Sequence, residues 1–292
     1  MGADMTGRIP KRAAKLAAAI LAATAVVAVA AVGTASAAVV FDDGPTPTPR
    51  NTFSLPLYET GYNITEFGAQ VQLTGASTTP TQVRVLMSSF ACGNMQEGTT
   101  CKTTTPKTYT RPITLNIYKV QGTGPGEEPI TTAENEPGKL ITTVTKTATV
   151  PFRPSASNKC PLEYQSATEE HVVGWSTECA KGKAFYVKYS KAELGKIRLP
   201  EKVIISVAYD GITGREGRDL HVAVTVPAAF ATPSVGGLPL QLPAANEELY
   251  LNSPTCAAYA EPTPPSCKQN TFSLASQWFY QPVFKVTGIP NS

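Results

Sequence analysis

Six cysteines are the residues of this 292-residue chain whose spacing most clearly predicts chemistry. They fall into three close pairs, well separated along the sequence: Cys92 and Cys101, Cys160 and Cys179, and Cys256 and Cys267. An even number of cysteines is typical of disulfide-bonded proteins outside the cell, where conditions are oxidising, and the N-terminal segment described below predicts export. Pairing of sequence neighbours is the simplest of the fifteen possible arrangements. We therefore predict three sequential disulfides, each closing a short loop.

The loop between Cys160 and Cys179 contains one of the two histidines, His171, and raises the alternative of a metal site. Zinc sites usually gather ligands as short pairs such as C-x2-C with H-x3-5-H. The two cysteines are separated by 18 residues, and the other histidine, His221, is fifty positions from His171. This spacing favours a surface loop closed by a disulfide and partly covered by Trp175 over a zinc centre.

The sequence contains no local motif for nucleophilic catalysis. A G-x-S-x-G nucleophile elbow is absent, and a catalytic triad requires a histidine base. His221 lies in the strand-like segment 219–226, where alternation places it opposite Leu220 and Val222. We therefore expect a partly exposed histidine on a strand and assign no catalytic residue.

Three pairs of adjacent glutamates suggest an alternative, carbohydrate hydrolysis by two carboxylates: Glu127 and Glu128, Glu169 and Glu170, and Glu247 and Glu248. Neighbours on a strand point to opposite faces, so adjacency in sequence does not create a catalytic pair. Two glutamates brought together from distant strands remain an open alternative.

The segment 210–219 offers Asp210, Glu216 and Asp219 as oxygen ligands for calcium. It lacks the alternating acidic spacing of an EF-hand loop, and two arginines would offset its carboxylates. We predict a connection between two strands, leave calcium binding open, and expect no cofactor.

Aromatic side chains predict either a sugar-binding strip or a packed core. The candidates for a strip are Tyr58, Tyr62, Tyr118, Tyr186, Tyr250 and Trp278. For Trp278 we favour the core, because alternation in 278–286 places it on one face with Phe284 and Val286.

The first 37 residues have the three parts of a secretory signal peptide. Basic residues at the start are followed by the apolar run 16–33 and by small residues ending in Ala-Ser-Ala37. We predict cleavage after Ala37 and a secreted protein; a retained transmembrane anchor is the alternative.

The charge balance argues against nucleic acid as a partner. Residues 1–37 hold four basic residues and one acidic residue, so the 25 basic and 22 acidic residues of the chain fall to 21 of each. Nucleic-acid binding requires a clustered positive surface. The sequence after residue 37 also has no apolar run of membrane-spanning length.

Apolar residues alternate with polar ones along most of the mature sequence, as in half-buried strands. The expected strands are 67–75, 83–89, 113–120, 139–152, 184–189, 202–209, 219–226, 248–252 and 278–286. Proline and glycine punctuate the intervening segments. The pattern predicts an all-β fold of about ten strands, a β-sandwich of the jelly-roll kind.

Helix and linker signals are few. The segment 189–197 predicts one helical turn ended by Gly195. Residues 38–50 read as a flexible Pro/Thr-rich leader. We expect one β-sandwich domain over 51–292, with proline-rich loops after 227.

The order of "FGAQVQLTG", "VRVLMSSFACG", "YTRPITLNIYKV", "PFRPSASNKC", "GWSTECAKGKAFYVKY" and "LPEKVIISVAYD" resembles a group of uncharacterised exported β-sandwich proteins of high-GC Gram-positive (actinobacterial) bacteria. The resemblance covers roughly residues 50 to 226. It implies an extracellular sandwich and no enzyme activity.

These observations predict a non-catalytic protein, secreted or held at the cell surface, that binds a cell-wall or extracellular glycan or a surface protein. A carbohydrate-active hydrolase and a structural extracellular component are the alternatives.

Overall fold

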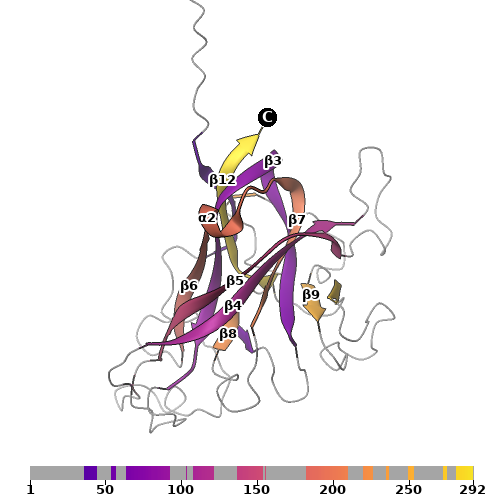
Figure 1. Cartoon of the computed structure of the whole chain (residues 1–292). Helices are drawn as coiled ribbons and strands as arrows, with labels where there is room; N and C mark the ends of the chain where they lie inside the picture. The colour runs from indigo at the N-terminus through magenta and orange to yellow at the C-terminus, as the bar shows by residue number, and fades with distance from the viewer. Residues whose placement is uncertain are drawn as a thin grey trace, which may run out of the picture. The chain divides into compact units, whose positions relative to one another are not determined.

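The computed structural model describes residues 36–44, 54–56, 64–92, 103, 108–121, 137–153, 155, 182–209, 220–225, 235–236, 249–252, 272–274 and 281–291. Ser36–Ser292 form one compact unit. The elements are β1 (Ala38–Asp42), β2 (Ser54–Pro56), β3 (Glu66–Ser89), β4 (Thr108–Val120), β5 (Pro137–Pro151), β6 (Lys183–Ser190), α2 (Lys191–Leu194), β7 (Leu199–Ala208), β8 (Leu220–Thr225), β9 (Leu249–Asn252), β10 (Ser273–Leu274), β11 (Gln281–Pro282) and β12 (Phe284–Asn291). The predicted all-β fold is confirmed (Figure 1).

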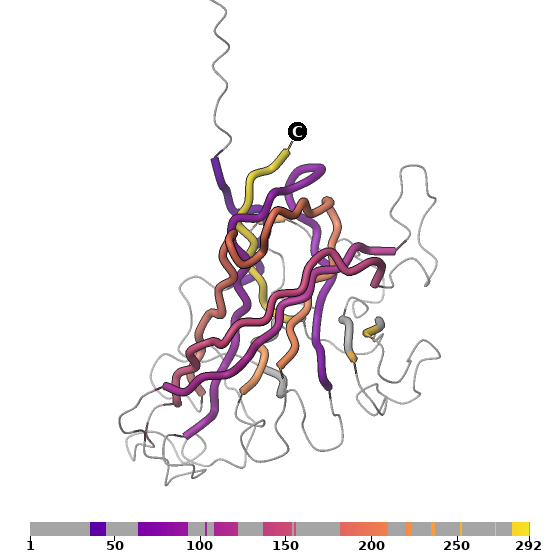
Figure 2. The backbone as a smooth tube through the Cα atoms, viewed as in Figure 1, coloured from indigo at the N-terminus to yellow at the C-terminus, as the bar shows by residue number. Residues whose placement is uncertain are grey.

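The long strand β3 organises the fold because it belongs to two layers. Its first part, Glu66–Gln72, pairs with β7 on one side and with β9 on the other. Its second part, from Ser77 onward, pairs with β12 and β6. Between the two parts Gly75 has a φ of 87°, a left-handed conformation that glycine adopts readily. Figure 2 shows β3 as one continuous tube that turns over between its two arms.

Each arm of β3 is the centre of one layer, and all described pairings are antiparallel. One layer has the order β5-β4-β7-β3, with β9 on the far side of β3. The other has β1-β12-β3-β6, and β8 pairs with the last three residues of β3. β7 lies between β3 and β4, and five successive residues of it, Val203–Val207, are buried, as in a central strand that is covered on both faces.

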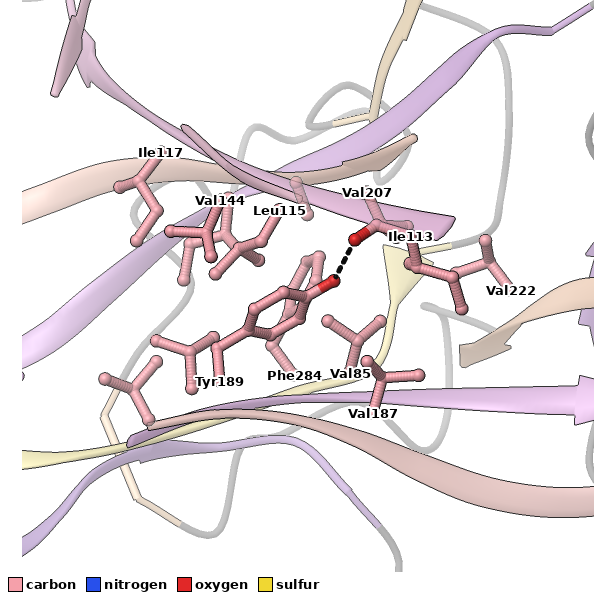
Figure 3. Close-up of a cluster of buried hydrophobic side chains, with 14 of the residues drawn as sticks. Val85, Ile113, Leu115, Ile117, Val144, Val187, Tyr189, Val207, Val222 and Phe284 are labelled. Carbon is pink, nitrogen blue, oxygen red and sulfur yellow. Dashed lines mark hydrogen bonds between the residues drawn. The ribbon is translucent and has the colours of Figure 1, made fainter. Parts of the chain in front are cut away.

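The core lies between these layers and is built from alternate residues of the strands. Phe67, Ala69 and Val71 enter it from the first arm of β3, and Val83 and Val85 enter from the second arm. Facing strands contribute further members of this cluster, among them Val286. Figure 3 shows Ile113, Leu115, Val187, Val207 and Phe284 in the cluster. The expected burial of Phe284 and Val286 is therefore confirmed.

Two expectations about the strands need correction. Residues 38–42 were expected in a flexible leader, but they form β1, because Val40 and Phe41 are fully buried in the core. The expected strands 67–75 and 83–89 are parts of the single strand β3. Pro80 does not interrupt β3 because it lies between the end of the β7 ladder and the start of the β6 ladder.

The predicted helical turn is confirmed as α2, a single turn that follows β6. Gly195 ends it with a φ of 76°, and its N–H donates to the carbonyl oxygen of Lys191. Across the described segments, no helix has both the length and the apolar character needed to cross a membrane.

Candidate functional site: the threonine face of the β4–β5 hairpin

The outer face of the β4–β5 hairpin carries twelve side chains without a charged residue among them. We call it the threonine face; its residues are Thr108, Thr110, Pro112, Thr114, Asn116 and Tyr118 of β4 and Leu140, Thr143, Thr145, Thr147, Thr149 and Pro151 of β5. They form six cross-strand pairs, from Thr108↔Pro151 to Tyr118↔Leu140. Successive pairs are two residues apart along each strand, so the six pairs extend over about 34 Å.

Strand alternation explains why these residues face outward. Ile113 and Leu115 of β4 and Val144 and Val150 of β5 point into the core. Their even spacing leaves the intervening threonines on the opposite side of the same strands. Threonine also favours the pleat, because its branched β-carbon restricts the side chain. Burial of one face thus determines which residues lie on the other.

Most of the threonine face is open to solvent. Seven of its members are exposed residues with short uncharged side chains: Thr108, Thr110, Pro112, Thr143, Thr145, Thr147 and Thr149. Leu140, at one end, is the only exposed large hydrophobic residue of the described segments, with 42% of its surface accessible. The hydroxyls of Thr114 and Thr145 are 2.7 Å apart and hydrogen-bonded across the strands. The face is therefore a regular array of uncharged side chains, most of which carry both a hydroxyl and a methyl group.

A hydrogen-bonded network anchors one end of this face to the neighbouring strands. The hydroxyl of Thr143 donates to Asn116 Oδ1 at 2.6 Å, and Asn116 Nδ2 donates to Glu66 Oε1 at 2.8 Å. The same oxygen accepts from Tyr118 at 2.9 Å and from Ser206. Three donors that share one buried carboxylate oxygen hold these side chains in fixed positions.

Tyr118 closes the end of the network and separates it from solvent. Burial raises the pKa of Tyr118, and the adjacent Glu66 charge raises it further, so the phenol stays protonated and donates. Its ring stacks on Phe272 with centroids 5.1 Å apart. Phe272 reaches the sheet because Gly68 has no side chain; a Cβ there would lie 2.8 Å from the Phe272 ring.

The threonine face offers hydroxyl and methyl groups to solvent. Its members include no carboxylate, imidazole, thiol or amine, which supply acids, bases and nucleophiles in enzymes. Threonine offers a hydroxyl that both donates and accepts hydrogen bonds, next to an apolar methyl group. A flat ligand with alternating hydroxyl and apolar groups matches this pattern.

Of the sequence-predicted candidates, His221 is described and occupies its expected position. It is half-buried on β8, on the face opposite to that of the core residues Leu220 and Val222. The centroid of its ring lies 4.3 Å from the centroid of the Phe90 ring. Ser88 is its cross-strand partner, but Ser88 is completely buried, so a substrate has no access to its hydroxyl. This pair gives no support to nucleophilic catalysis.

Most other predicted site residues lie outside the described segments. Cys92 is described and is disulfide-bonded, whereas Cys101, Cys160, Cys179, Cys256 and Cys267 are outside, so the predicted pairing stays a prediction. His171, Trp175, Trp278, Tyr58, Tyr62 and the three glutamate pairs are also outside. Of the predicted aromatic candidates, the side chains of Tyr118 and Tyr186 are described.

The segment 210–219 also lies outside the described residues, but both of its flanks are described. The buried hydroxyl of Tyr209 donates to the carbonyl oxygen of Leu220, across the base of this connection. The hydrogen bond supports the predicted role as a link between two strands, since β7 ends and β8 begins here. Calcium binding by the segment stays an open prediction.

The spacing of the threonines in the sequence is compatible with the threonine face but does not reveal it. Threonines occupy every second position from Thr143 to Thr149, and Val144, Lys146 and Ala148 stand between them. The missing information was the pairing partner, because only the β4–β5 register brings the two threonine rows together. Glu66 was missed because nothing in its sequence surroundings indicates burial.

Comparisons with models of protein families, with curated proteins and with solved structures find no match to this chain.

Proposed function

We propose that the mature chain is an exported, non-catalytic β-sandwich protein that binds a neutral extracellular polysaccharide through the threonine face. The observation that carries this proposal is the uncharged, exposed array of paired residues from Thr108↔Pro151 to Tyr118↔Leu140. Solvent-facing strands usually carry charged side chains, which favour hydration and oppose edge-to-edge association. Their absence over twelve positions favours a surface that contacts a ligand.

The chemistry of a neutral polysaccharide is complementary to this face. Sugar hydroxyls donate and accept hydrogen bonds, as threonine hydroxyls do, and the C–H groups of sugar rings pack against methyl groups and against Leu140. A surface about 34 Å long contacts several sugar units at once, so weak individual contacts add up along the polymer.

Rigidity of the face lowers the entropic cost of binding. The Thr114–Thr145 hydrogen bond and the link from Thr143 through Asn116 to Glu66 restrict side chains before a ligand arrives. Preorganised side chains lose less conformational freedom on association. The paired strands beneath them are also fixed by core packing of Ile113 and Leu115.

Export is part of the proposal and rests on the signal-peptide pattern of residues 1–37. The compact unit begins at Ser36, close to the predicted cleavage after Ala37, and β1 begins at Ala38. Cleavage at this place leaves every described strand intact. The disulfide bond at Cys92 agrees with an oxidising compartment.

Co-sedimentation of the purified mature chain with insoluble neutral polysaccharides tests the proposal. We expect saturable binding to at least one polymer, with an affinity that changes little between about 0.05 and about 1 M salt, because no ion pair contributes. Absence of binding across a panel of neutral glucans, xylans, mannans and chitin would contradict the proposal. Binding that disappears at high salt would assign the interaction to charged residues instead.

A further inference from the structure

Three basic residues lie in one cross-strand row on the outer face of the second layer. Lys285 of β12 is the register partner of Arg84 of β3, and Arg84 is the partner of Lys188 of β6. Their chain neighbours, including Val83, Val85 and Val187, point into the core, so the three basic side chains point outward. We call Lys285, Arg84 and Lys188 the basic row; it spans about 10 Å across three strands.

Such an arrangement is unfavourable unless a negative charge compensates it, because like charges directly opposite each other on neighbouring strands repel. Lys285 has a carboxylate partner in Asp42. Arg84 Nε donates to the neutral side-chain oxygen of Gln82, and among the described residues neither Arg84 nor Lys188 forms an ion pair. Two adjacent positive charges on this face are therefore not neutralised by described residues.

The groups around the basic row suit an anionic ligand. Asp42 is already engaged by Lys285, and burial raises the pKa of Asp43, which favours its neutral form. Tyr186 lies two residues before Lys188 on the same face of β6. Burial and the nearby Asp42 and Asp43 raise its pKa, so it keeps its proton and can donate.

The geometry of Arg84 indicates the kind of anion. The bond from Nε to Gln82 leaves the two terminal guanidinium nitrogens, whose parallel N–H groups match the two oxygens of a carboxylate. Lys188 is exposed beside Arg84, whereas Lys285 and Arg84 are half-buried. An anionic group that binds Arg84 is therefore within reach of Lys285 and Lys188 on the two flanking strands.

We propose that the basic row, with Gln82 and Tyr186, is a second binding site, specific for the carboxylates of an acidic polysaccharide. The row is short, so it contacts one or two carboxylates at a time, whereas nucleic acids require an extended positive surface. The site lies on the layer that does not contain β4 and β5, and it does not depend on the threonine face.

Binding of polygalacturonate to the mature chain tests this second site. We expect salt-sensitive binding that weakens about tenfold or more in the double variant Arg84→Gln/Lys188→Gln, because two charge-assisted contacts are lost. Lys119→Gln/Lys139→Gln is the matched control, since both lysines are exposed members of β4 and β5, and it should bind as the parent does. Retained binding in the first variant would overturn the proposal.

Two further arms separate charge from geometry. Arg84→Lys keeps the charge but removes the guanidinium fork, so we expect weakened binding with an unchanged circular dichroism spectrum. Equal affinity of Arg84→Lys and the parent would overturn the role of the fork.

Fully methyl-esterified polygalacturonate should not compete at this site, and tighter binding of polyphosphate than of polygalacturonate would overturn the assignment to carboxylates. Loss of the threonine-face interaction leaves these results unchanged, so the two proposals fail independently.

Discussion

The phenol of Tyr189 on β6 donates a 3.0 Å hydrogen bond to the carbonyl oxygen of Ile113 on β4, across the core (Figure 3). This bond joins the two layers directly, because β4 and β6 belong to different arms of the sheet network. Burial and the nearby Glu193 raise the pKa of Tyr189, so its phenol keeps the proton that it donates. The layer that carries the threonine face is thereby tied to the opposite layer.

Replacing Tyr189 with Phe should lower the free energy of unfolding by about 1 to 3 kcal/mol. The substitution keeps the ring but removes the donor, and it leaves the buried carbonyl oxygen of Ile113 with one fewer partner. Urea denaturation followed by circular dichroism measures the change. A variant as stable as the parent would show that the hydrogen bond contributes nothing net to layer packing.

The left-handed conformation of Gly195 gives a prediction about backbone strain. Its φ is 76°, and a Cβ placed there would have no atom within 4 Å, so alanine meets no steric clash with neighbouring groups. Gly195→Ala should therefore destabilise the protein by about 1 to 2 kcal/mol through backbone strain alone. The exposed neighbour Lys196 provides a control, because Lys196→Ala should leave the melting temperature nearly unchanged. Equal melting temperatures for the two variants would contradict this account of α2.

The ion pair between Lys146 and Glu193 predicts a dependence of stability on pH. The hydrogen bonds from Lys146 and from Ser190 lower the pKa of Glu193 to about 2, from an ordinary value of 4.5. Because the folded pKa is the lower one, the stabilisation is present above about pH 4.5 and is lost as the pH falls toward about 2. Both side chains are about one-third exposed, so its size should stay below about 1 kcal/mol.

Comparison of the Glu193→Gln variant with the parent protein tests the pH range over which this stabilisation is lost. The difference in unfolding free energy between the two proteins should be present at about pH 7 and should vanish near pH 2. Thermal or urea unfolding at a series of pH values measures it. A difference that is constant over the whole range would show that Glu193 acts through packing and not through its charge.

The predicted disulfides are open to a direct chemical test. Peptide mapping of the unreduced mature chain should link Cys92 to Cys101, Cys160 to Cys179 and Cys256 to Cys267. Cys92 is disulfide-bonded in the structure, so a free thiol at this position is not expected. A cross-pair such as Cys101–Cys160 would refute sequential pairing.

Local periodicity predicted most of the longer strands and, for several of them, the side that faces the core. Alternation in 113–120 predicted the inward facing of Ile113 and Leu115, and burial confirms it. The continuity of β3 was not predictable from local pattern, because Pro80 normally indicates a break. It is tolerated because the β7 ladder ends before it and the β6 ladder begins after it, and on the β12 side it pairs with Gly288 next to a shift in register. Strand β1 was missed since its burial depends on β12, which lies at the other end of the sequence.

Candidate sites were harder to predict because they depend on partners distant in sequence. Glu66 receives hydrogen bonds from Asn116 and Ser206, 50 and 140 residues away along the chain. The basic row likewise joins Arg84 to Lys188 and Lys285 only through strand register. Local motifs therefore predicted sites in loops and at cysteines. The two candidate binding surfaces instead arise from the register in which the strands pair.

The central claim is that the threonine face binds a neutral polysaccharide. The affinity of the Thr147→Lys variant for the polysaccharide that the parent protein binds tests this claim most directly. Thr147 is exposed in the middle of the threonine face, opposite Pro112, so lysine places a charge and a long side chain where the ligand is expected. We predict affinity reduced about tenfold or more, with an unchanged melting temperature. Ala192→Lys adds the same charge on the exposed surface of α2 and should bind as the parent does. Equal affinities of Thr147→Lys and the parent would contradict the assignment of binding to the threonine face.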